Sequence, residues 1–110
     1  MVEVTYKKGD GQKYKERKNI TKVVIHRDVD EIGKHAFNEC PDLTEIDWGD
    51  SKVTKIGLKA FRKTGLVKIK FPDSVKEIRL NVLSTCTQLT EIEGKVEKIV
   101  DAAIFNCKNL

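Results

Sequence analysis

The segment Ile32–Leu43, with the sequence IGKHAFNECPDL, decides the fold of this chain, because weaker copies of it recur along the sequence. The residues that open successive copies are spaced by 23, 23, 23 and 21 positions. These residues are Ile20, Leu43, Leu66, Leu89 and Leu110. Self-similarity with a period of about 20 to 50 residues is typical of a solenoid. The sequence therefore predicts a stack of coils, each contributed by one copy.

Apolar residues occupy matching columns of the repeat. An aliphatic residue follows the opening residue by three positions, and every copy then has a V-x-x-I pair. Eight positions past that isoleucine lies the column Cys40, Thr64, Cys86 and Cys107. We interpret these four as small side chains packed under a turn. Cys86 and Cys107 lie in neighbouring coils, and whether they can pair depends on a geometry that the sequence does not give.

Each copy predicts a short strand. The pattern at Leu43–Trp48 ends in the period-two alternation of a half-buried strand, and pairing with its copy in the next coil would build a parallel sheet. The V-x-x-I pair predicts a second extended segment after a corner. The stretch after Gly33 predicts a short helical or 3₁₀ turn on the outer side. The predicted fold is a mainly β repeat solenoid of about four coils.

Composition excludes two broad classes of protein. The 110 residues are 39% hydrophobic and 35% charged, without the long apolar run of a membrane span or the low hydrophobicity of a disordered chain. The net charge is +4, and residues 1–19 hold six bases against three acids. Residues 20–110 are close to neutral, so the basic excess is concentrated before the repeats.

The repeat resembles a known family. The runs Phe71–Ile78 (FPDSVKEI) and Ile32–Leu43 are similar to the BspA-type leucine-rich repeat over residues 20–110. The resemblance implies a right-handed leucine-rich solenoid used for adhesion and protein recognition, with no catalytic residues. It also implies a cell-surface or secreted protein. A cytoplasmic location stays open, because the N-terminus lacks the apolar core of a signal peptide.

The repeat boundaries divide the chain into a cap and four units. The units are residues 20–42, 43–65, 66–88 and 89–110, and the last is tightened because Val96 follows Ile92 by only four positions. Residues 1–19 are expected to form a β-hairpin that caps the first coil, with a basic tail as the alternative. Since Leu110 would open a further coil, the chain is either part of a longer array or stacks on another chain through an open edge.

The predicted interaction surface consists of residues that flank the central aliphatic of the first strand. Its members are Lys22, Val24, His26, Glu45, Asp47, Lys68, Lys70, Glu91 and Glu93. The column Lys22, Glu45, Lys68, Glu91 alternates in sign, as does the column Glu31, Lys55, Glu77, Lys98. Neighbouring coils lie about 4.8 Å apart, so each column predicts a ladder of ion pairs that fixes the register. Mixed signs also disfavour nucleic acid as a partner of the repeats.

No cluster of residues predicts catalysis. His26 and His35 lack a second ligand at metal-site spacing, and no phosphate-binding glycine motif occurs. Trp48 and Phe71 align with Ile25, so core packing is preferred over a role as exposed binding residues. We therefore expect no enzymatic activity, no cofactor and no metal.

Three functional hypotheses follow. The first is a non-catalytic recognition or adhesion module for an unidentified protein partner. The second is a structural element that self-associates through the exposed C-terminal coil. The third has the basic N-terminal segment bind an anionic partner while the repeats serve as scaffold.

Overall fold

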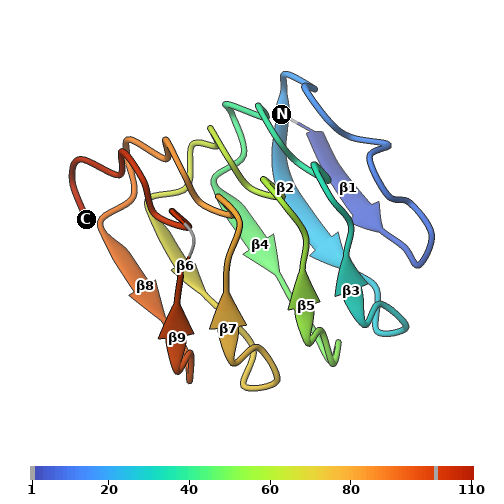
Figure 1. Ribbon diagram of the computed structural model, residues 1–110. Coiled ribbons are helices and arrows are strands. Elements are labelled where there is room, and N and C mark those ends of the chain that lie inside the picture. Colours follow the sequence, from blue (N-terminus) through green and yellow to red (C-terminus); the bar gives the residue numbers. More distant parts are fainter. Residues whose placement is uncertain (1, 101) are drawn as a thin grey trace.

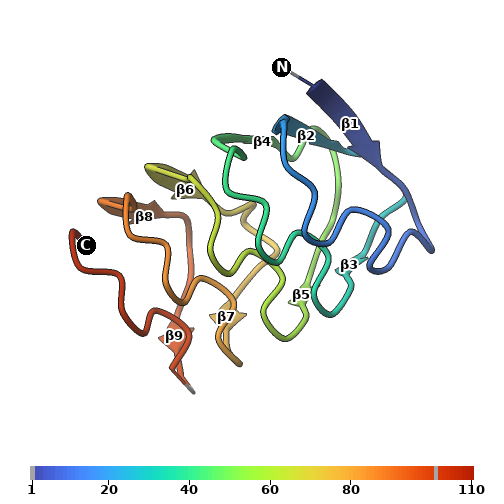
Figure 2. The same cartoon turned by 90° about the horizontal axis from the view of Figure 1, so that it is seen from above.

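The computed structural model describes residues 2–100 and 102–110, and in them the chain winds through successive coils of short strands (Figure 1). The strands are β1 (Val2–Tyr6), β2 (Ile20–Ile25), β3 (Glu31–Ile32), β4 (Glu45–Asp47), β5 (Lys55–Ile56), β6 (Lys68–Lys70), β7 (Glu77–Ile78), β8 (Glu91–Glu93) and β9 (Lys98–Ile99). They form two rows on different sides of the solenoid (Figure 2). One row holds β1, β2, β4, β6 and β8, and the other holds β3, β5, β7 and β9.

All strand pairs are parallel and keep the register that the repeat predicts. Val23 in β2 lies beside Ile46 in β4, and Ile32 in β3 lies beside Ile56 in β5. The predicted β-solenoid of about four coils is therefore confirmed. Its core contains the repeat columns, with Val23, Ile32, Phe37 and Leu43 fully buried.

The outer segments contain no helix in the described residues, so the predicted helical or 3₁₀ turns are wrong. Within Gly33–Cys40, alternate N–H groups bond inside the coil, as Ala36 does to the Gly33 carbonyl. The intervening groups donate to the next coil, as Phe37 does to the Ala60 carbonyl at 2.7 Å. The positive φ angles of His35 (61°) and Glu39 (59°) produce this alternation. Bonding to the next coil uses donors that a helix would need for itself.

The N-terminal segment is a further coil and not the expected hairpin. Strand β1 runs parallel to β2, and residues 7–19 contain no strand. Tyr14 occupies the place of Phe37 in the repeat: their rings stack 5.8 Å apart, and the Tyr14 carbonyl accepts from the Cys40 thiol at 3.1 Å. The Tyr6 hydroxyl accepts from the Gly33 N–H and donates to the Gly11 carbonyl. The alternation in 2–6 fits any edge strand, so it did not distinguish a hairpin from a coil.

Aromatic rings run through the first half of the core. Phe61 stacks on Phe37 with ring centroids 5.7 Å apart, and Trp48 meets Phe61 edge-on at 6.1 Å. Phe71 lies 6.0 Å from Trp48. Both Trp48 (9% exposed) and Phe71 (1% exposed) are buried, which confirms their expected core position.

The strand row that contains β4 and β6 has a break between them. Strands β1, β2 and β4 form one sheet, while β6 and β8 form another. The turn that precedes β6 is one residue shorter than its counterparts, because Thr64 is followed by Gly65 alone before Leu66. A Cβ on Gly65 would lie 2.5 Å from the Pro41 carbonyl oxygen. The short turn therefore lies close against the preceding coil, and at this same level of the solenoid both strand rows are interrupted, between β4 and β6 and between β5 and β7.

The fourth coil is tightened in sequence but still in register. Strands β8 and β9 pair with β6 and β7. Gly94 has a φ of 124° and lies where the preceding coil has Phe71, against whose backbone a Cβ would clash at 2.9 Å. Because Gly94 has no side chain, the backbone of this shortened coil can pass close to Phe71.

Candidate interaction surface

The predicted surface residues lie together on the outward side of the first strand row, which we call the strand face. Lys22 pairs in register with Glu45, Val24 with Asp47, Lys68 with Glu91 and Lys70 with Glu93. The side chains of this face are exposed or half-buried. The structure therefore brings these eight predicted residues together as two groups, one on each side of the break between β4 and β6.

The first charge ladder forms within each group. The Lys22 ammonium lies 3.5 Å from a Glu45 carboxylate oxygen and 3.6 Å from one of Glu3. Glu45, followed by Glu3, raises the pKa of Lys22. Lys68 contacts Glu91 at 4.0 Å and Glu93 at 3.4 Å. Exposed pairs of this kind contribute only about 0–1 kcal/mol each, so their side chains remain available to a partner.

The ladders are less complete than the sequence predicts. No ion pair joins Glu45 to Lys68 in the described part of the chain, because the break separates their strands. In the second column, Glu31 lies beside Lys55 in register, as Glu77 does beside Lys98. Among the residues that the structure describes, neither Glu31 and Lys55 nor Glu77 and Lys98 form an ion pair with each other. The charges of this column therefore alternate between coils without direct contacts between the paired residues.

His26, the ninth predicted residue, follows β2 and is occupied by a local contact. Its Nδ1 accepts a hydrogen bond from the Asp28 N–H at 3.1 Å. Across residues 2–100 and 102–110, no three His, Cys, Asp or Glu side chains lie close enough together to hold a metal ion. The arrangement around His26 is that of a turn.

The cysteines of the repeat column pack in the core or at its edge. Cys40 and Cys86 are fully buried, Cys107 is half-buried, and all three are free thiols. The Cys86 thiol donates to the Phe61 carbonyl and the Cys107 thiol to the Leu83 carbonyl, each at 3.1 Å. Burial raises the pKa of all three thiols. A raised pKa keeps them protonated at neutral pH and opposes nucleophilic chemistry.

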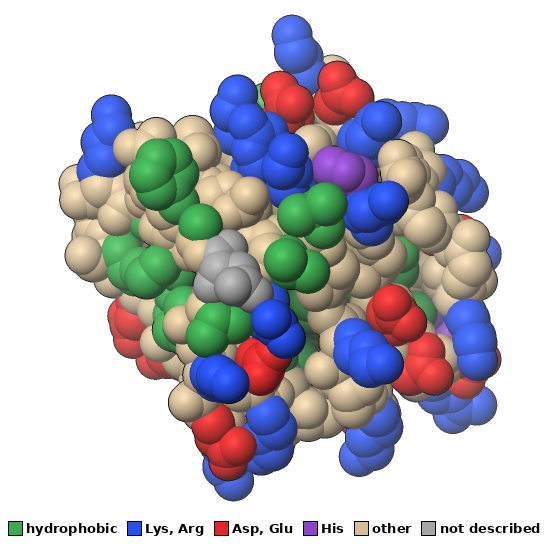
Figure 3. Space-filling model, viewed as in Figure 1, with side chains coloured by type: hydrophobic (Ala, Val, Ile, Leu, Met, Phe, Trp, Pro, Cys, Tyr) green, Lys and Arg blue, Asp and Glu red, His purple; other side chains and the backbone are tan. Residues whose placement is uncertain are grey.

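A second surface was missed by the sequence reasoning. It is the outward side of the segments that follow the second strand row, and we call it the turn face. Viewed from the side of β3, β5, β7 and β9, Lys and Arg side chains gather around a histidine, with hydrophobic side chains beside them (Figure 3). The cations are Lys15, Lys34, Lys59, Arg62 and Lys63. They come from the N-terminal coil and the two coils after it.

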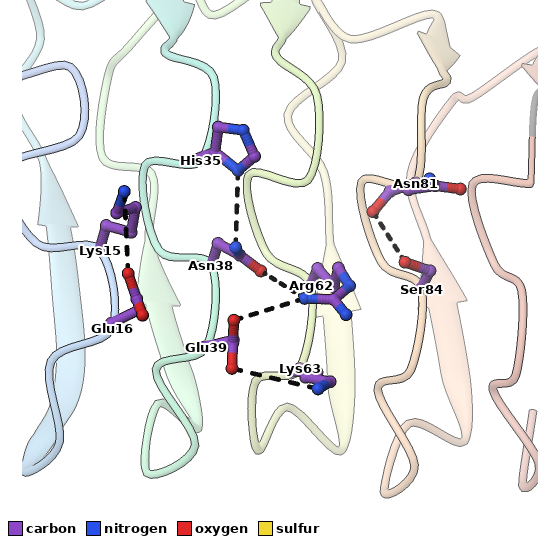
Figure 4. A network of polar contacts seen from close by, with 9 residues as sticks. All are labelled: Lys15, Glu16, His35, Asn38, Glu39, Arg62, Lys63, Asn81 and Ser84. Atoms are coloured by element: carbon purple, nitrogen blue, oxygen red, sulfur yellow. Dashed lines mark hydrogen bonds and ion pairs between the residues drawn. The ribbon is translucent and has the colours of Figure 1, made fainter.

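Hydrogen bonds connect these coils at the turn face (Figure 4). The Arg62 guanidinium donates to the side-chain oxygen Oδ1 of Asn38 at 3.2 Å and lies 3.6 Å from a Glu39 carboxylate oxygen. The Asn38 amide lies 3.5 Å from His35 Nδ1. Partial burial, followed by the charges of Lys59 and other cations, lowers the pKa of His35. A neutral imidazole is therefore favoured within a cationic neighbourhood.

The sequence signal for the turn face is the recurrence of basic residues in one stretch of the repeat. Its full extent can be seen only when the N-terminal segment is recognised as a coil. Lys15 belongs to the same stretch of the repeat as His35 and Lys59 only if residues 1–19 form a coil. With a hairpin in that place, the basic residues of 13–18 have no spatial relation to those of the later coils.

Stacked parallel coils with a buried leucine-rich core define a leucine-rich-repeat solenoid. A family model described as "BspA type Leucine rich repeat region" matches six copies over residues 11–110, and the chain belongs to this family. The match begins inside the segment that we expected to be a cap, in agreement with a coil there. No curated protein and no solved structure matches the chain. Among the described residues, no helix has the length and apolar character to cross a membrane.

Proposed function

We propose that the chain is a non-catalytic recognition or adhesion module that binds a protein through the strand face. The observation that carries the proposal is the exposed row of outward side chains that parallel pairing holds in fixed register, from Lys22 and Glu45 to Lys68 and Glu91. A preorganised surface loses little conformational entropy on binding. Family membership supports a role in protein interaction.

The chemistry of the strand face fits a polar partner of mixed charge. Acidic and basic side chains alternate along it, and Lys70 and Asp47 add charges outside the ladder. Opposite charges across an interface guide orientation and partner choice more than they add affinity. The histidines and cysteines are occupied by local or core contacts, which supports a binding role over catalysis.

Site-specific photo-crosslinking tests this proposal. A photoreactive phenylalanine analogue would replace Asp47 or Lys70 on the strand face, and Lys52 or Lys95 at exposed turns as matched controls. After incubation with an extract of the source organism, we expect one protein adduct with the strand-face variants and none with the controls. Equal adducts at all four positions, or none at any, would contradict a specific interface on this face.

Self-association is the second candidate, supported by exposed apolar side chains on the last coil. Ile99 is 45% and Leu110 46% exposed. Stacking copies head to tail in the register of the sheet would place Glu91 beside Glu3, and like charges directly opposite each other are destabilising. Sedimentation velocity over a range of concentrations separates this role from the first, since an assembly element would form larger species as concentration rises.

A further inference from the structure

The turn face has two chemically different halves. Its N-terminal half, from the N-terminal coil to the second repeat coil, carries Lys15, Lys34, Lys59, Arg62 and Lys63. Its C-terminal half, in the third and fourth coils, carries exposed apolar side chains, among them Leu80 and Phe105. The strand face holds paired charges, whereas the N-terminal half of the turn face holds these five cations against two acids, Glu16 and Glu39.

The basic half is incompletely neutralised. Glu39 contacts Arg62 at 3.6 Å and Lys63 at 4.0 Å, and Glu16 contacts Lys15 at 3.7 Å. Neither Lys34 nor Lys59 forms an ion pair within the described residues, although both affect His35 electrostatically. The half therefore presents two unpaired ammonium groups and a surplus of positive charge.

The apolar half is exposed at a cost to local stability. Phe105, in the fourth repeat coil, is 67% exposed, whereas Asn38 and Ser84 in the same column of earlier coils are buried. Leu80 is 47% exposed although coils flank it on both sides. Its φ is 52°, a left-handed conformation that is disfavoured for leucine. Positive φ angles occur in the turn segments of the other coils as well, for example at His35 and Lys59, so it is the exposure of Leu80 that bears on binding.

We propose that the turn face docks an acidic segment of a partner protein that also carries an apolar anchor. The acidic part would lie over Lys34 and Lys59, and the anchor would lie against Leu80 and Phe105. Five turn segments at about 4.8 Å per coil extend over about 19 Å, the length of roughly six extended residues. This inference rests on the proposed recognition function and names a second surface and the chemistry of its partner.

The apolar half distinguishes this partner from a simple polyanion. A sulfated polysaccharide would need only the cations and would gain nothing from Phe105. Single-stranded nucleic acid gains affinity by stacking bases on aromatic side chains. The aromatic rings beneath the basic half, Tyr14, Phe37 and Phe61, are buried and cannot serve as such a platform. Charge complementarity together with an adjacent apolar patch fits an acidic, partly apolar peptide best.

Fluorescence anisotropy with two labelled peptides tests the proposal. The first peptide has five acidic residues followed by a Leu-Phe pair, and the second has Ser-Ser in place of Leu-Phe. We expect the first peptide to bind at least about fivefold more tightly, since a buried aromatic anchor dominates such contacts. Leu80→Asn combined with Phe105→Ser should abolish this preference, and asparagine tolerates the positive φ of position 80.

Matched variants separate the two halves. Lys34→Gln with Lys59→Gln should weaken both peptides and flatten their salt dependence, because fewer charges are neutralised on binding. Lys52→Gln with Lys76→Gln is the matched control, because it removes the same charge from exposed positions elsewhere. It should change the affinity for either peptide less than twofold, since charges outside the contact add little to affinity. Val67→Ser, at a residue that is 51% exposed, is the corresponding apolar control. Trp48 fluorescence verifies that each variant is folded.

Two results would overturn the inference. Equal affinity for both peptides, with heparin displacing both and the apolar variant unchanged, would assign the surface to polyanions in general. No binding of either peptide at millimolar concentration would remove the docking surface altogether. Crosslinks from the strand face would survive both results, so the recognition function and this inference fail independently.

Discussion

Replacing Phe61 by alanine should remove the centre of the aromatic stack and destabilise the whole solenoid. Phe61 is fully buried, with Phe37 on one side at 5.7 Å and Trp48 at 6.1 Å. Truncation of a buried phenylalanine costs about 3–5 kcal/mol. A domain of this size has a total stability of roughly 5–16 kcal/mol. Because each coil is supported only by its neighbours, the loss in the second repeat coil weakens contacts on both sides.

Urea unfolding followed by fluorescence measures this loss directly, because Trp48 is the only tryptophan and contacts the mutated ring. With a slope of about 2 kcal/mol per molar urea, the middle of the usual range, the midpoint should fall by about 1.5–2.5 M. Phe61→Leu is the matched variant, since Leu83 fills the same column one coil later, and it should lose only about 1–2 kcal/mol. A midpoint shift below about 0.3 M for Phe61→Ala, with an unchanged slope, would refute the stacked core.

Three further perturbations test other parts of the structure. Gly65→Ala should lower the unfolding free energy by more than about 1 kcal/mol in the same assay, because its Cβ would lie 2.5 Å from a backbone oxygen; a neutral result would refute the tight turn. The pKa of the Cys86 thiol is raised by burial, so its contribution to stability is complete below about pH 8.5, where the unfolded thiol ionises, and declines as the pH rises toward the folded pKa. Urea midpoints at pH 7 and pH 9.5 should therefore converge between the wild type and Cys86→Ala, and a constant gap would refute this. Lys22→Glu should cost about 1 kcal/mol or less, an effect that shrinks at high salt, because the change places three carboxylates in a row.

The repeat predicted the fold because its columns report burial directly. Every coil needs the same inward residues, so Val23 and Ile46 align in sequence and also pair in the sheet. The interpretation of the cysteine column as buried side chains rested on the same alignment of the copies. Register is equally well specified, since a slip by one residue would turn every core side chain outward.

The turn segments and the N-terminal coil were predicted incorrectly because the contacts between coils that shape them are not visible in one copy of the repeat. The apolar spacing after Gly33 is compatible with a helix, but the N–H groups of His35, Phe37 and Glu39 donate to the next coil. Such bonds between coils leave no periodic signature in a single copy. Tyr14 was missed in the same way, because it fills the Phe37 column without the surrounding motif.

The division of charge between the two faces explains why net charge along the sequence was a poor guide to the binding surface. In the strands, acidic residues alternate with lysines from coil to coil, so Glu45 offsets Lys22. In the turn segments, Lys34 and Lys59 have no acidic partner in the described structure. Residues 20–110 hold 15 bases against 14 acids, so acidic residues elsewhere in the repeats offset the turn-face cations, and the average hides a surplus that is local to one face. A partner that approaches the strand face meets matched pairs whose contribution is small, whereas one that approaches the turn face meets uncompensated charge beside exposed apolar side chains.

Removing equal charge from each face therefore tests which face carries binding. This test is sharper than truncating the N-terminal coil, because Tyr6 and Tyr14 of that coil are part of the core.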